Sequence, residues 1–420
     1  MQDLFHRLGR ALVIVAVFLL MWVLNYRLGI SLLGNMANRD FMSLWTGGKA
    51  VLSNTDPYAP GAWPELRLEY GSTWIRDPVC PFPLWTLVAV APLSLLPLDA
   101  AAALLTTLSE AALILTIGIM LGSAERGPKR LGRAAQPPPR TVRASTSFRE
   151  SKLESKGHLE RRLIVFLVLL AAMLSRPFLT TLIHGQLAAL LTASLAVGVV
   201  LYARGQSFKA GMVLSLLILK PNLPVLFLPA VALLFLVRRD WHGTLGLASG
   251  GLGLLLLAWM VQPGWFVEWL GVSEKTRVTF GMPTLWGLAF DLAPERRLTL
   301  GIALTATVTA VVLLVVAKRS DNPQLGMGLA ICGSLMVTPY LWNYDQLLLL
   351  VPALIAFNRV EARSWLRVTT WFVVVLVIPW GLFWIANRRG FDALSVFVTI
   401  VTGACLFTCC LLEDSTTRSA

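Results

Sequence analysis

Apolar segments long enough to cross a membrane recur along the whole chain. A transmembrane helix needs about 20 mainly apolar residues. Segments of this kind cover residues 12–33, 100–121, 163–180, 187–203, 241–261, 298–317, 366–385 and 391–412. Only 14% of the 420 residues are charged, far below the roughly 25% that is usual in soluble domains. The sequence therefore predicts a polytopic membrane protein, folded as a single membrane domain over residues 1–420.

Helices are the expected structure of these segments, which makes the predicted fold class all-α. A helix satisfies its own backbone hydrogen bonds in lipid, and the segments lack the alternating pattern of outer-membrane strands. Many of the 15 tryptophans stand near segment ends, where Trp anchors a helix at the interface. The first segment follows Arg7 and Arg10 and has no small-residue cleavage site after it. We therefore interpret it as a retained helix and not as a signal peptide.

Basic residues are concentrated in one segment, residues 123–162. It holds eleven Lys or Arg residues against four Glu, together with three consecutive prolines at 137–139. This composition is typical of a disordered linker. The linker can bind anionic lipid, or it can act only as a topology determinant under the positive-inside rule. In either case 123–162 lies in the cytoplasm, and the net charge of +13 requires no nucleic-acid partner.

The positive-inside rule also places the N-terminus in the cytoplasm. An even number of crossings must then separate it from the basic linker, although three apolar runs lie between them. The run 83–96 is short and is interrupted by Pro92, so we expect it to be re-entrant or interfacial. Residues 34–98 then form one large first extracytoplasmic loop that contains juxtamembrane helices.

Continuing the count along the chain gives about twelve transmembrane helices with both termini cytoplasmic. The regions 208–237 and 325–357 each contain two crossings, which meet outside at 220–224 and 339–345. A second extracytoplasmic loop covers 262–297. Most ionisable residues near membrane depth then converge on the outer side. Because charge within a membrane is costly, such residues indicate a functional site, and we expect an extracytoplasmic site in the plasma membrane.

Two aspartates of the first loop are candidate site residues. Asp40 stands where the first span meets the loop, before an apolar stretch that suits a helix lying on the membrane. Its carboxylate suits a helix N-cap and a general base equally well. Asp56 belongs to an Asp-Pro-Tyr sequence, which favours a turn. Asp56 and Tyr58 are nevertheless also candidates for sugar or acceptor binding.

Later outer segments contribute further polar residues. His184 and Gln186 flank a glycine at an outer helix start, where each can cap a helix or bind a sugar. Lys220 precedes a proline inside an apolar run. Its ammonium group can snorkel to lipid phosphate, or it can hold the phosphate of a lipid-linked substrate as a point charge.

An aromatic and polar cluster occupies residues 338–346. Aromatic rings beside amides and carboxylates are a normal lining for a sugar site, so Tyr340, Asn343 and Asp345 are candidates for sugar or acceptor binding. Asp345 can instead interact only with the dipole of the next helix. The chain has four His, no metal motif and no Gly-rich phosphate loop, so the sequence predicts neither a metal nor another cofactor.

Taken together, these segments resemble glycosyltransferase family 87, whose members are integral membrane enzymes of the GT-C superfamily. The resemblance rests on the order and spacing of short motifs between about residues 38 and 352. These are Asn-Arg-Asp-Phe at 38–41, Gly-Gly-Lys-Ala at 47–50, Asp-Pro-Tyr at 56–58, Pro-Phe-Pro-Leu-Trp at 81–85, His-Gly-Gln at 184–186, Lys-Pro at 220–221 and Thr-Pro-Tyr at 338–340. The family's late cluster often has Ser-Pro followed by a His-containing stretch, whereas this chain has Asn-Tyr-Asp at 343–345.

The resemblance implies an inverting transfer of a hexose or pentose, often mannose, from a polyprenyl-phosphate donor. The acceptor would be a lipid-linked or cell-envelope glycan, and membrane lipid the remaining partner. Asp40 matches the family's catalytic aspartate and would act as the general base. Lys220, with Arg76 or Arg277, would bind the donor phosphate. Since this phosphate is already a competent leaving group, a second catalytic carboxylate is not required.

Two other functions stay open on the sequence alone. A transporter or flippase of lipid-linked sugars would usually show matching halves with paired broken helices, and no such repeat is visible. A GT-C-like glycan ligase or polymerase would carry its largest outer loop late in the chain, whereas here the longest, 34–98, comes first.

Overall fold

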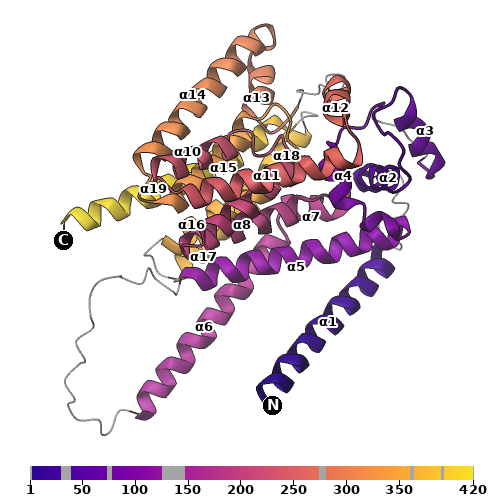
Figure 1. Cartoon of the computed structure of the whole chain (residues 1–420). Helices are drawn as coiled ribbons and strands as arrows, with labels where there is room; N and C mark the ends of the chain where they lie inside the picture. The colour runs from indigo at the N-terminus through magenta and orange to yellow at the C-terminus, as the bar shows by residue number, and fades with distance from the viewer. Residues whose placement is uncertain are drawn as a thin grey trace.

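The computed structural model of the chain describes residues 2–29, 39–72, 78–124, 147–273, 281–359, 364–388 and 392–419. Within these residues every regular element is a helix and none is a strand (Figure 1). The predicted all-α fold class is therefore confirmed.

Most of the helices are joined by short connections. The first part of the chain forms α1 (Gln2–Leu28), α2 (Asp40–Leu52), α3 (Ala62–Glu69), α4 (Leu84–Val90), η3 (Leu93–Leu95), α5 (Leu98–Ala124), α6 (Ser147–Met173), α7 (Arg176–His184) and α8 (Ala188–Ala203). The middle part forms α9 (Ser207–Ser215), η4 (Leu216–Leu219), α10 (Phe227–Val237), α11 (Trp241–Val261), α12 (Trp265–Ser273), α13 (Leu285–Leu292), η6 (Pro294–Arg296) and α14 (Arg297–Lys318). The last part forms α15 (Pro323–Val337), η7 (Asn343–Leu349), α16 (Leu350–Arg359), α17 (Ser364–Phe372), η8 (Val373–Val377), α18 (Ile378–Asn387), η9 (Ala393–Ser395) and α19 (Val396–Ser419).

Several of these helices can cross a membrane. Among the described residues, five stretches are long and apolar enough, namely 11–28, 98–123, 241–261, 294–318 and 365–387. The prediction of a polytopic membrane protein is therefore confirmed, but the count of about twelve crossings is not. Some predicted crossings are short. α10, for example, has 11 residues, and at about 1.5 Å per residue it is far shorter than the roughly 30 Å hydrocarbon core.

The predicted span 163–180 is divided between two helices, α6 and α7, which meet at an angle of 54°. Pro177 occupies the first turn of α7, where a missing N–H is tolerated although it could not continue a preceding helix. The bent pair counts as a sixth span if it crosses the membrane as one unit. α6 begins at Ser147, so residues 147–162 of the expected linker 123–162 are helical. Residues 125–146 lie outside the described part of the chain.

Two helix breaks occur where the sequence predicts them. In the region 208–237, η4 ends at Leu219 and α10 begins at Phe227. In the region 325–357, α15 ends at Val337 and η7 begins at Asn343. Prolines within both gaps prevent a continuous helix.

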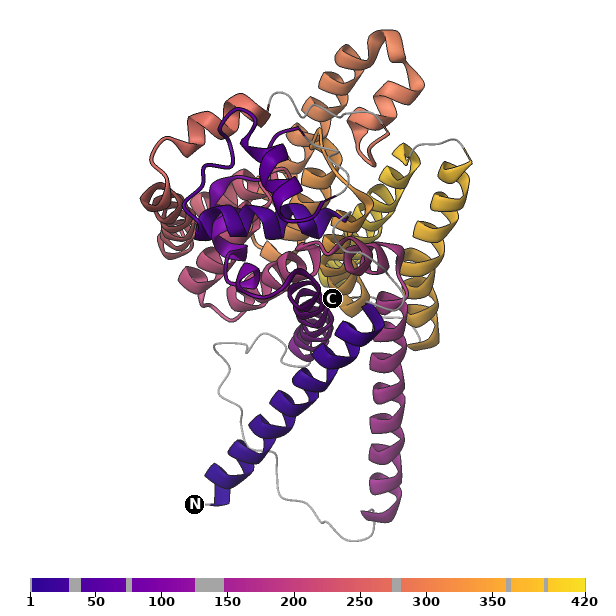
Figure 2. The same ribbon diagram turned by 90° about the vertical axis from the view of Figure 1, so that its right-hand side faces the viewer.

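The segment expected as the first outer loop, residues 34–98, contributes α2, α3, α4 and η3. These short helices gather with α12 at one end of the bundle, whereas α1 and α6 extend away from it (Figures 1 and 2). The run 83–96 folds as α4 and η3, which are too short to cross. The expected second loop, 262–297, contributes α12, α13 and η6. The side of the membrane that this end faces stays a prediction.

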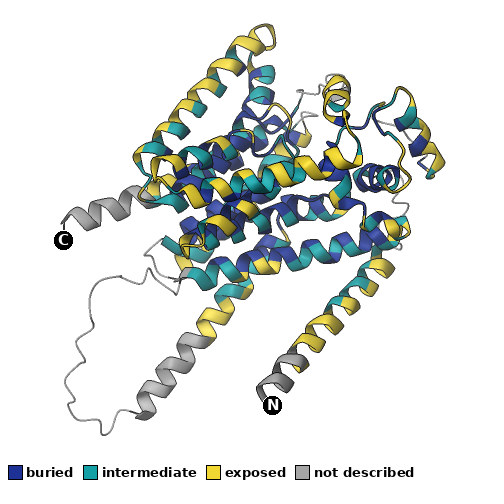
Figure 3. Cartoon of the chain, in the orientation of Figure 1, coloured by how far each residue is buried: buried dark blue, intermediate teal, exposed yellow. Residues whose placement is uncertain are grey.

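Burial separates an inner layer of helices from an outer one. α8 is buried along most of its length, whereas α1, α11 and α14 expose apolar side chains such as Leu12, Met260 and Ile302 (Figure 3). Soluble proteins rarely expose apolar side chains along whole helices in this way. They suit helices whose outer surface contacts lipid.

Candidate active site

A cavity lined by polar and aromatic side chains lies where the expected first outer loop, residues 34–98, meets the helix breaks after η4 and after α15. Its volume is about 220 Å³, and its wall includes Asp40, Gln186, Lys220 and Tyr340. The sequence predicted all four as site residues, although they stand in four separate parts of the chain. Folding thus brings a carboxylate, an amide, an ammonium group and a phenol into one enclosure.

Asp40 is the first residue of α2 and does not cap it. The N-cap position belongs to Arg39, so the N-cap interpretation of Asp40 is wrong, although its charge still suits the helix N-terminus. Three side chains approach one oxygen, Oδ2. Gln186 Nε2 donates to it at 3.0 Å, the Tyr344 hydroxyl donates at 3.4 Å, and His184 Nδ1 lies at 3.7 Å. Oδ1 has no hydrogen-bond partner among the described residues.

Lys220 points into the protein. Its Nζ lies 2.6 Å from Asp345 Oδ1, donates to Gln186 Oε1 at 3.5 Å, and stands 4.5 Å from the centre of the Tyr344 ring. With only 12% of the side chain exposed, Lys220 is not snorkelling to a lipid surface. A cation enclosed in this way is available to an anion that enters the cavity.

The position of Lys220 is fixed by contacts of η4, the 3₁₀ turn before it. Trp85 Nε1 of α4 donates to the Ile218 carbonyl at 2.9 Å, and the Thr86 hydroxyl donates to the Leu219 carbonyl. These bonds satisfy carbonyls that a helix end leaves without partners. The expected first outer loop, residues 34–98, therefore supplies Asp40 from α2, and its helix α4 also holds Lys220 in place.

Tyr344 connects the two charged groups of the cavity. Its hydroxyl donates to Asp40, and its ring faces the Lys220 ammonium group. Burial raises the pKa of Tyr344 well above its usual range, and the negative charges of Asp345 and Asp40 add to this effect. The phenol therefore stays protonated and serves as a hydrogen-bond donor to Asp40.

The sequence profile of glycosyltransferase family 87 matches residues 81–339, which is more than half of the chain. The protein belongs to glycosyltransferase family 87. The resemblance noted in the sequence is thereby confirmed, and membership supports a glycosyltransferase activity for the chain. The matched range contains Gln186 and Lys220 but not Asp40. Searches among curated proteins and among solved structures give no match.

In this glycosyltransferase, two residues of the late cluster lie behind the cavity wall. Asp345 is fully buried, where it accepts from Lys220 and from the Trp342 backbone N–H at 3.2 Å. Asp345 is therefore the counter-ion of Lys220. The sugar contact that we expected of it is not available to a side chain that is fully buried. Burial raises the pKa of Asp345 and outweighs the opposing effect of Lys220. Asn343 Nδ2 instead faces Asp392 Oδ2, at 3.4 Å.

Asp392 belongs to a second polar network beside η7. It forms a two-pronged ion pair with Arg176, with N–O distances of 3.0 and 2.6 Å. Arg176 also donates to Ser395 Oγ at 3.1 Å, and Gln346 Nε2 donates to the Ser395 carbonyl at 2.6 Å. These contacts attach the residues before α19 to α7 and η7. They give Asn343 a structural role in place of the predicted sugar contact.

Asp56 and Tyr58 also lie outside the cavity wall. Asp56 Oδ1 accepts from the Tyr58 backbone N–H at 2.8 Å, which is the turn that the sequence favours. The Tyr58 hydroxyl donates to the Phe82 carbonyl at 2.8 Å. Because Phe82 is part of the wall, Tyr58 supports the cavity from behind, and neither residue is placed to bind a sugar.

The other predicted site residues fall into two groups. His184 is half exposed at the end of α7 and lies beside Asp40 and Tyr344, with its ring centre 5.8 Å from the Tyr344 ring centre. Tyr340 lines the cavity, where its hydroxyl accepts from Trp342 Nε1 at 2.8 Å. Arg76 and Arg277 lie outside the described residues, so their proposed contact with a phosphate stays a prediction.

The sequence did not single out several residues that the structure places at the site. Ser43, one turn after Asp40, lines the cavity and accepts from Arg67, a buried arginine on α3. Trp269 of α12 also lines the cavity and donates to the Pro81 carbonyl at 3.3 Å. A motif such as Lys-Pro is conspicuous in the sequence because a charge and a proline interrupt an apolar run. Ser43 has no such sequence signal, and only the structure shows that it lies on the same face of α2 as Asp40.

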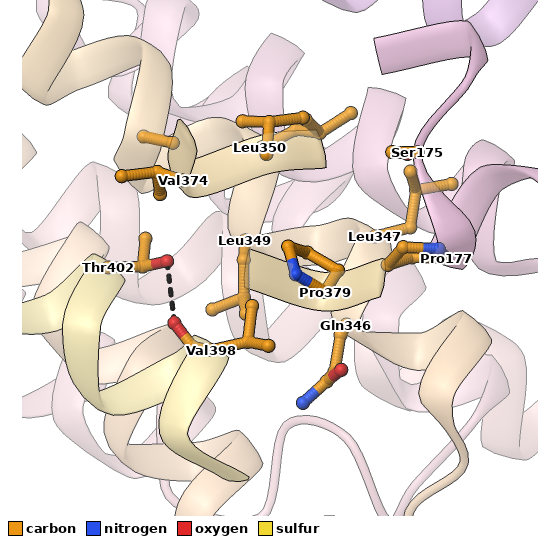
Figure 4. A pocket seen from close by; sticks show the side chains of 12 residues that line it. Ser175, Pro177, Gln346, Leu347, Leu349, Leu350, Val374, Pro379, Val398 and Thr402 are labelled. Atoms are coloured by element: carbon orange, nitrogen blue, oxygen red, sulfur yellow. Dashed lines mark hydrogen bonds between the residues drawn. The ribbon is translucent and has the colours of Figure 1, made fainter. Parts of the chain in front are cut away.

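A second hollow lies behind η7 and differs in character. It has a volume of about 20 Å³, room for little more than one water molecule. Its wall is mainly aliphatic, with Leu347, Leu349 and Val398 around it and Gln346 at one edge (Figure 4). It offers no charged group to a sugar phosphate, so the larger cavity is the candidate active site. No cluster of three potential metal ligands occurs among the described residues.

Proposed function

We propose that this family 87 enzyme transfers a sugar from a polyprenyl-phosphate donor, with Asp40 as the general base and Lys220 as the cation for the donor phosphate. Mannose is the first candidate for the sugar, and other hexoses and pentoses follow. The observation that carries the proposal is the link through Gln186, which contacts Asp40 at 3.0 Å and Lys220 at 3.5 Å. A base and an anion-binding group that contact the same side chain suit an acceptor hydroxyl and a departing phosphate on the same sugar carbon.

The reaction would proceed in one displacement. Asp40 Oδ1 accepts the proton of an acceptor hydroxyl while the hydroxyl oxygen attacks the anomeric carbon. The bond from that carbon to the phosphate oxygen breaks, and the phosphate leaves with the bonding electrons, so that the configuration inverts. Lys220 stabilises the negative charge that builds on the leaving group. A donor with one phosphate requires no metal ion for this charge.

The surroundings of the cavity support a lipid-borne donor. Its wall joins helices of a multi-pass membrane protein, and α11 and α12 beside it carry exposed apolar side chains such as Met260 and Val267. A polyprenyl chain could remain in lipid while its phosphate reaches Lys220. We further propose that the acceptor is a lipid-linked or cell-envelope glycan and that the cavity opens on the extracytoplasmic face of the plasma membrane.

The direct test compares the wild type with Asp40→Asn in membranes supplied with radiolabelled polyprenyl-phosphate mannose. General bases contribute about 10²- to 10⁴-fold to a rate, so we expect label transfer to fall by at least 100-fold while the amount of inserted protein stays the same. Asp56→Asn is the matched control, because Asp56 is a carboxylate of the same segment that lies outside the cavity wall. It should keep the wild-type rate.

Three results would contradict parts of the proposal. Wild-type transfer by Asp40→Asn would remove Asp40 as the base. Transfer from a sugar nucleotide and not from any polyprenyl-phosphate sugar would remove the donor class. Movement of labelled lipid across purified proteoliposomes without covalent transfer would favour a flippase. Mass spectra of lipid and glycan extracts from cells with wild-type or Asp40→Asn protein would then identify the acceptor by the sugar it lacks.

A further inference from the structure

The amide of Gln186 stands between the two charged groups of the cavity. Its Nε2 donates to Asp40 Oδ2 at 3.0 Å, and its Oε1 accepts from Lys220 Nζ at 3.5 Å. Gln186 itself is only 4% exposed. The sequence offered a helix cap or a sugar contact for this residue, and the structure gives its side chain a different pair of partners.

These partners determine how the amide is oriented. An amide has a donating NH₂ group and an accepting oxygen, whereas a carboxylate only accepts and an ammonium group only donates. The reverse orientation would place the amide oxygen against Asp40 and the NH₂ group against Lys220, and both contacts would be repulsive. Gln186 therefore fits between Asp40 and Lys220 in one orientation only.

The backbone around Gln186 is held as firmly as its side chain. α7 ends in a Schellman arrangement, in which the Gln186 N–H donates to the Thr181 carbonyl at 3.0 Å and the Gly185 N–H to the Leu182 carbonyl at 3.3 Å. Gly185 has a φ of +64°. A Cβ atom there would lie 2.6 Å from the Cβ of Phe41, the residue after Asp40. The end of α7 is thus packed directly against the start of α2.

We infer that Gln186 is a positioning residue, which orients the base and ties its position to that of the phosphate-binding cation. By holding Oδ2 of Asp40, it leaves Oδ1 directed at the acceptor. Through its oxygen it fixes the distance between Asp40 and Lys220, and hence between the two reacting ends of the displacement. This inference rests on the proposed function of Asp40 and Lys220.

Gln186→Leu and Gln186→Glu test this role in complementary ways. Leucine keeps the approximate size of the side chain but removes the donor, so we expect kcat to fall by about 10- to 100-fold with little change in the KM of the donor. Glutamate keeps an oxygen for Lys220 but places a second oxygen in place of the NH₂ group that donates to Asp40. Its kcat should therefore fall further than that of Gln186→Leu.

Matched controls separate this role from others. Gln206→Leu changes an exposed glutamine at the corresponding position after α8 and should keep the wild-type kcat and KM. In an Asp40→Asn background, Gln186→Leu should cause no further loss, because Gln186 acts through Asp40. Melting temperatures in detergent check that both Gln186 variants are folded.

The outcomes decide between the possible roles. A raised KM of the donor with an unchanged kcat in Gln186→Leu would show a substrate contact and overturn the inference. A full additional loss in the Asp40→Asn background would also overturn it. If wild-type membranes transfer no sugar from a polyprenyl-phosphate donor, the proposed function itself fails, whereas normal wild-type transfer with an unaltered Gln186→Leu variant refutes only the positioning role.

Discussion

Lys220 and Asp345 form an ion pair with 2.6 Å between Nζ and Oδ1, although 125 residues separate them in the chain. Each residue stands next to a break between helices, because Lys220 directly follows η4 and Asp345 lies in the first turn of η7. The Asp345 carboxylate is fully buried and also accepts from the Trp342 backbone. The pair therefore joins the two helix breaks and supplies the cavity with a cation whose charge is balanced from behind.

Lys220→Met should both destabilise the protein and abolish transfer. Removing one member of a buried ion pair costs about 3–5 kcal/mol, because the other charge is left without compensation. Burial raises the pKa of Asp345, and without Lys220 the carboxyl will take up a proton still more readily. The folded variant then binds this proton more tightly than the unfolded chain, so its stability falls as pH rises. The loss in melting temperature should be larger at about pH 8 than at about pH 5.

The double variant Lys220→Met, Asp345→Leu separates stability from activity. It removes both charges, and replacing a buried pair with apolar side chains is often neutral or stabilising. We expect the melting temperature in detergent to recover toward the wild-type value, while label transfer from polyprenyl-phosphate sugar stays at the level of Lys220→Met. Recovery of transfer in the double variant would contradict the role of Lys220 as the phosphate cation.

Tyr344→Phe should reduce transfer modestly without altering the fold. Phenylalanine keeps the ring that faces Lys220 but removes the hydroxyl that donates to Asp40 at 3.4 Å. A contact of this length is weak for a hydrogen bond to a charged group, so we expect kcat to fall by about 3- to 10-fold.

The alkaline limb of a pH–rate profile distinguishes a hydrogen-bond donor from a catalytic acid. The pKa of Tyr344 is raised well above its usual range, so the phenol stays protonated at a pH at which an exposed tyrosine ionises. Wild type and Tyr344→Phe should therefore have the same alkaline limb in a pH–rate profile. Loss of an alkaline limb in Tyr344→Phe would indicate that Tyr344 titrates during catalysis.

The sequence located the charged residues of the site but not their pairing. Asp40 and Lys220 stood out because a charge at the edge of an apolar run is costly and calls for an explanation. The contact from Gln186 to Asp40 spans 146 residues, and its existence depends on how α7 packs against α2. Asp56 illustrates the opposite case, because its turn with Tyr58 is local and its composition alone favours it.

The bounds of a helix could be predicted where an apolar run is uninterrupted. They were predicted less well where a proline interrupts the run. The expected span 241–261 agrees with α11 at both ends. The expected span 163–180 contains Ser175 and Pro177, and there the chain bends by 54° between two helices. Hydropathy measures only whether a residue prefers water or lipid. A bend depends instead on the backbone hydrogen bonds of the helix, which proline interrupts. The same limit explains why the number of crossings could not be derived from apolar runs alone.

Gly185→Ala should damage activity more than its effect on stability would indicate. Gly185 combines a φ of +64° with a contact of 2.6 Å between an added Cβ and Phe41. The left-handed backbone costs an alanine about 1–2 kcal/mol. The contact with Phe41 must in addition push α7 away from α2, which separates Gln186 from Asp40 and lowers kcat.

Gly205→Ala provides a control in which only the backbone cost is present. Gly205 has a φ of +75° after α8 and precedes Gln206. The backbone repeats the arrangement at the end of α7, because the Gly205 N–H donates to the Tyr202 carbonyl and the Gln206 N–H donates to the Leu201 carbonyl. A Cβ atom added to it meets nothing within 4 Å. Both variants should lose some thermal stability in detergent, but only Gly185→Ala should lose transfer from radiolabelled polyprenyl-phosphate sugar. Equal transfer by the two variants would show that the packing of Gly185 against Phe41 does not position the base.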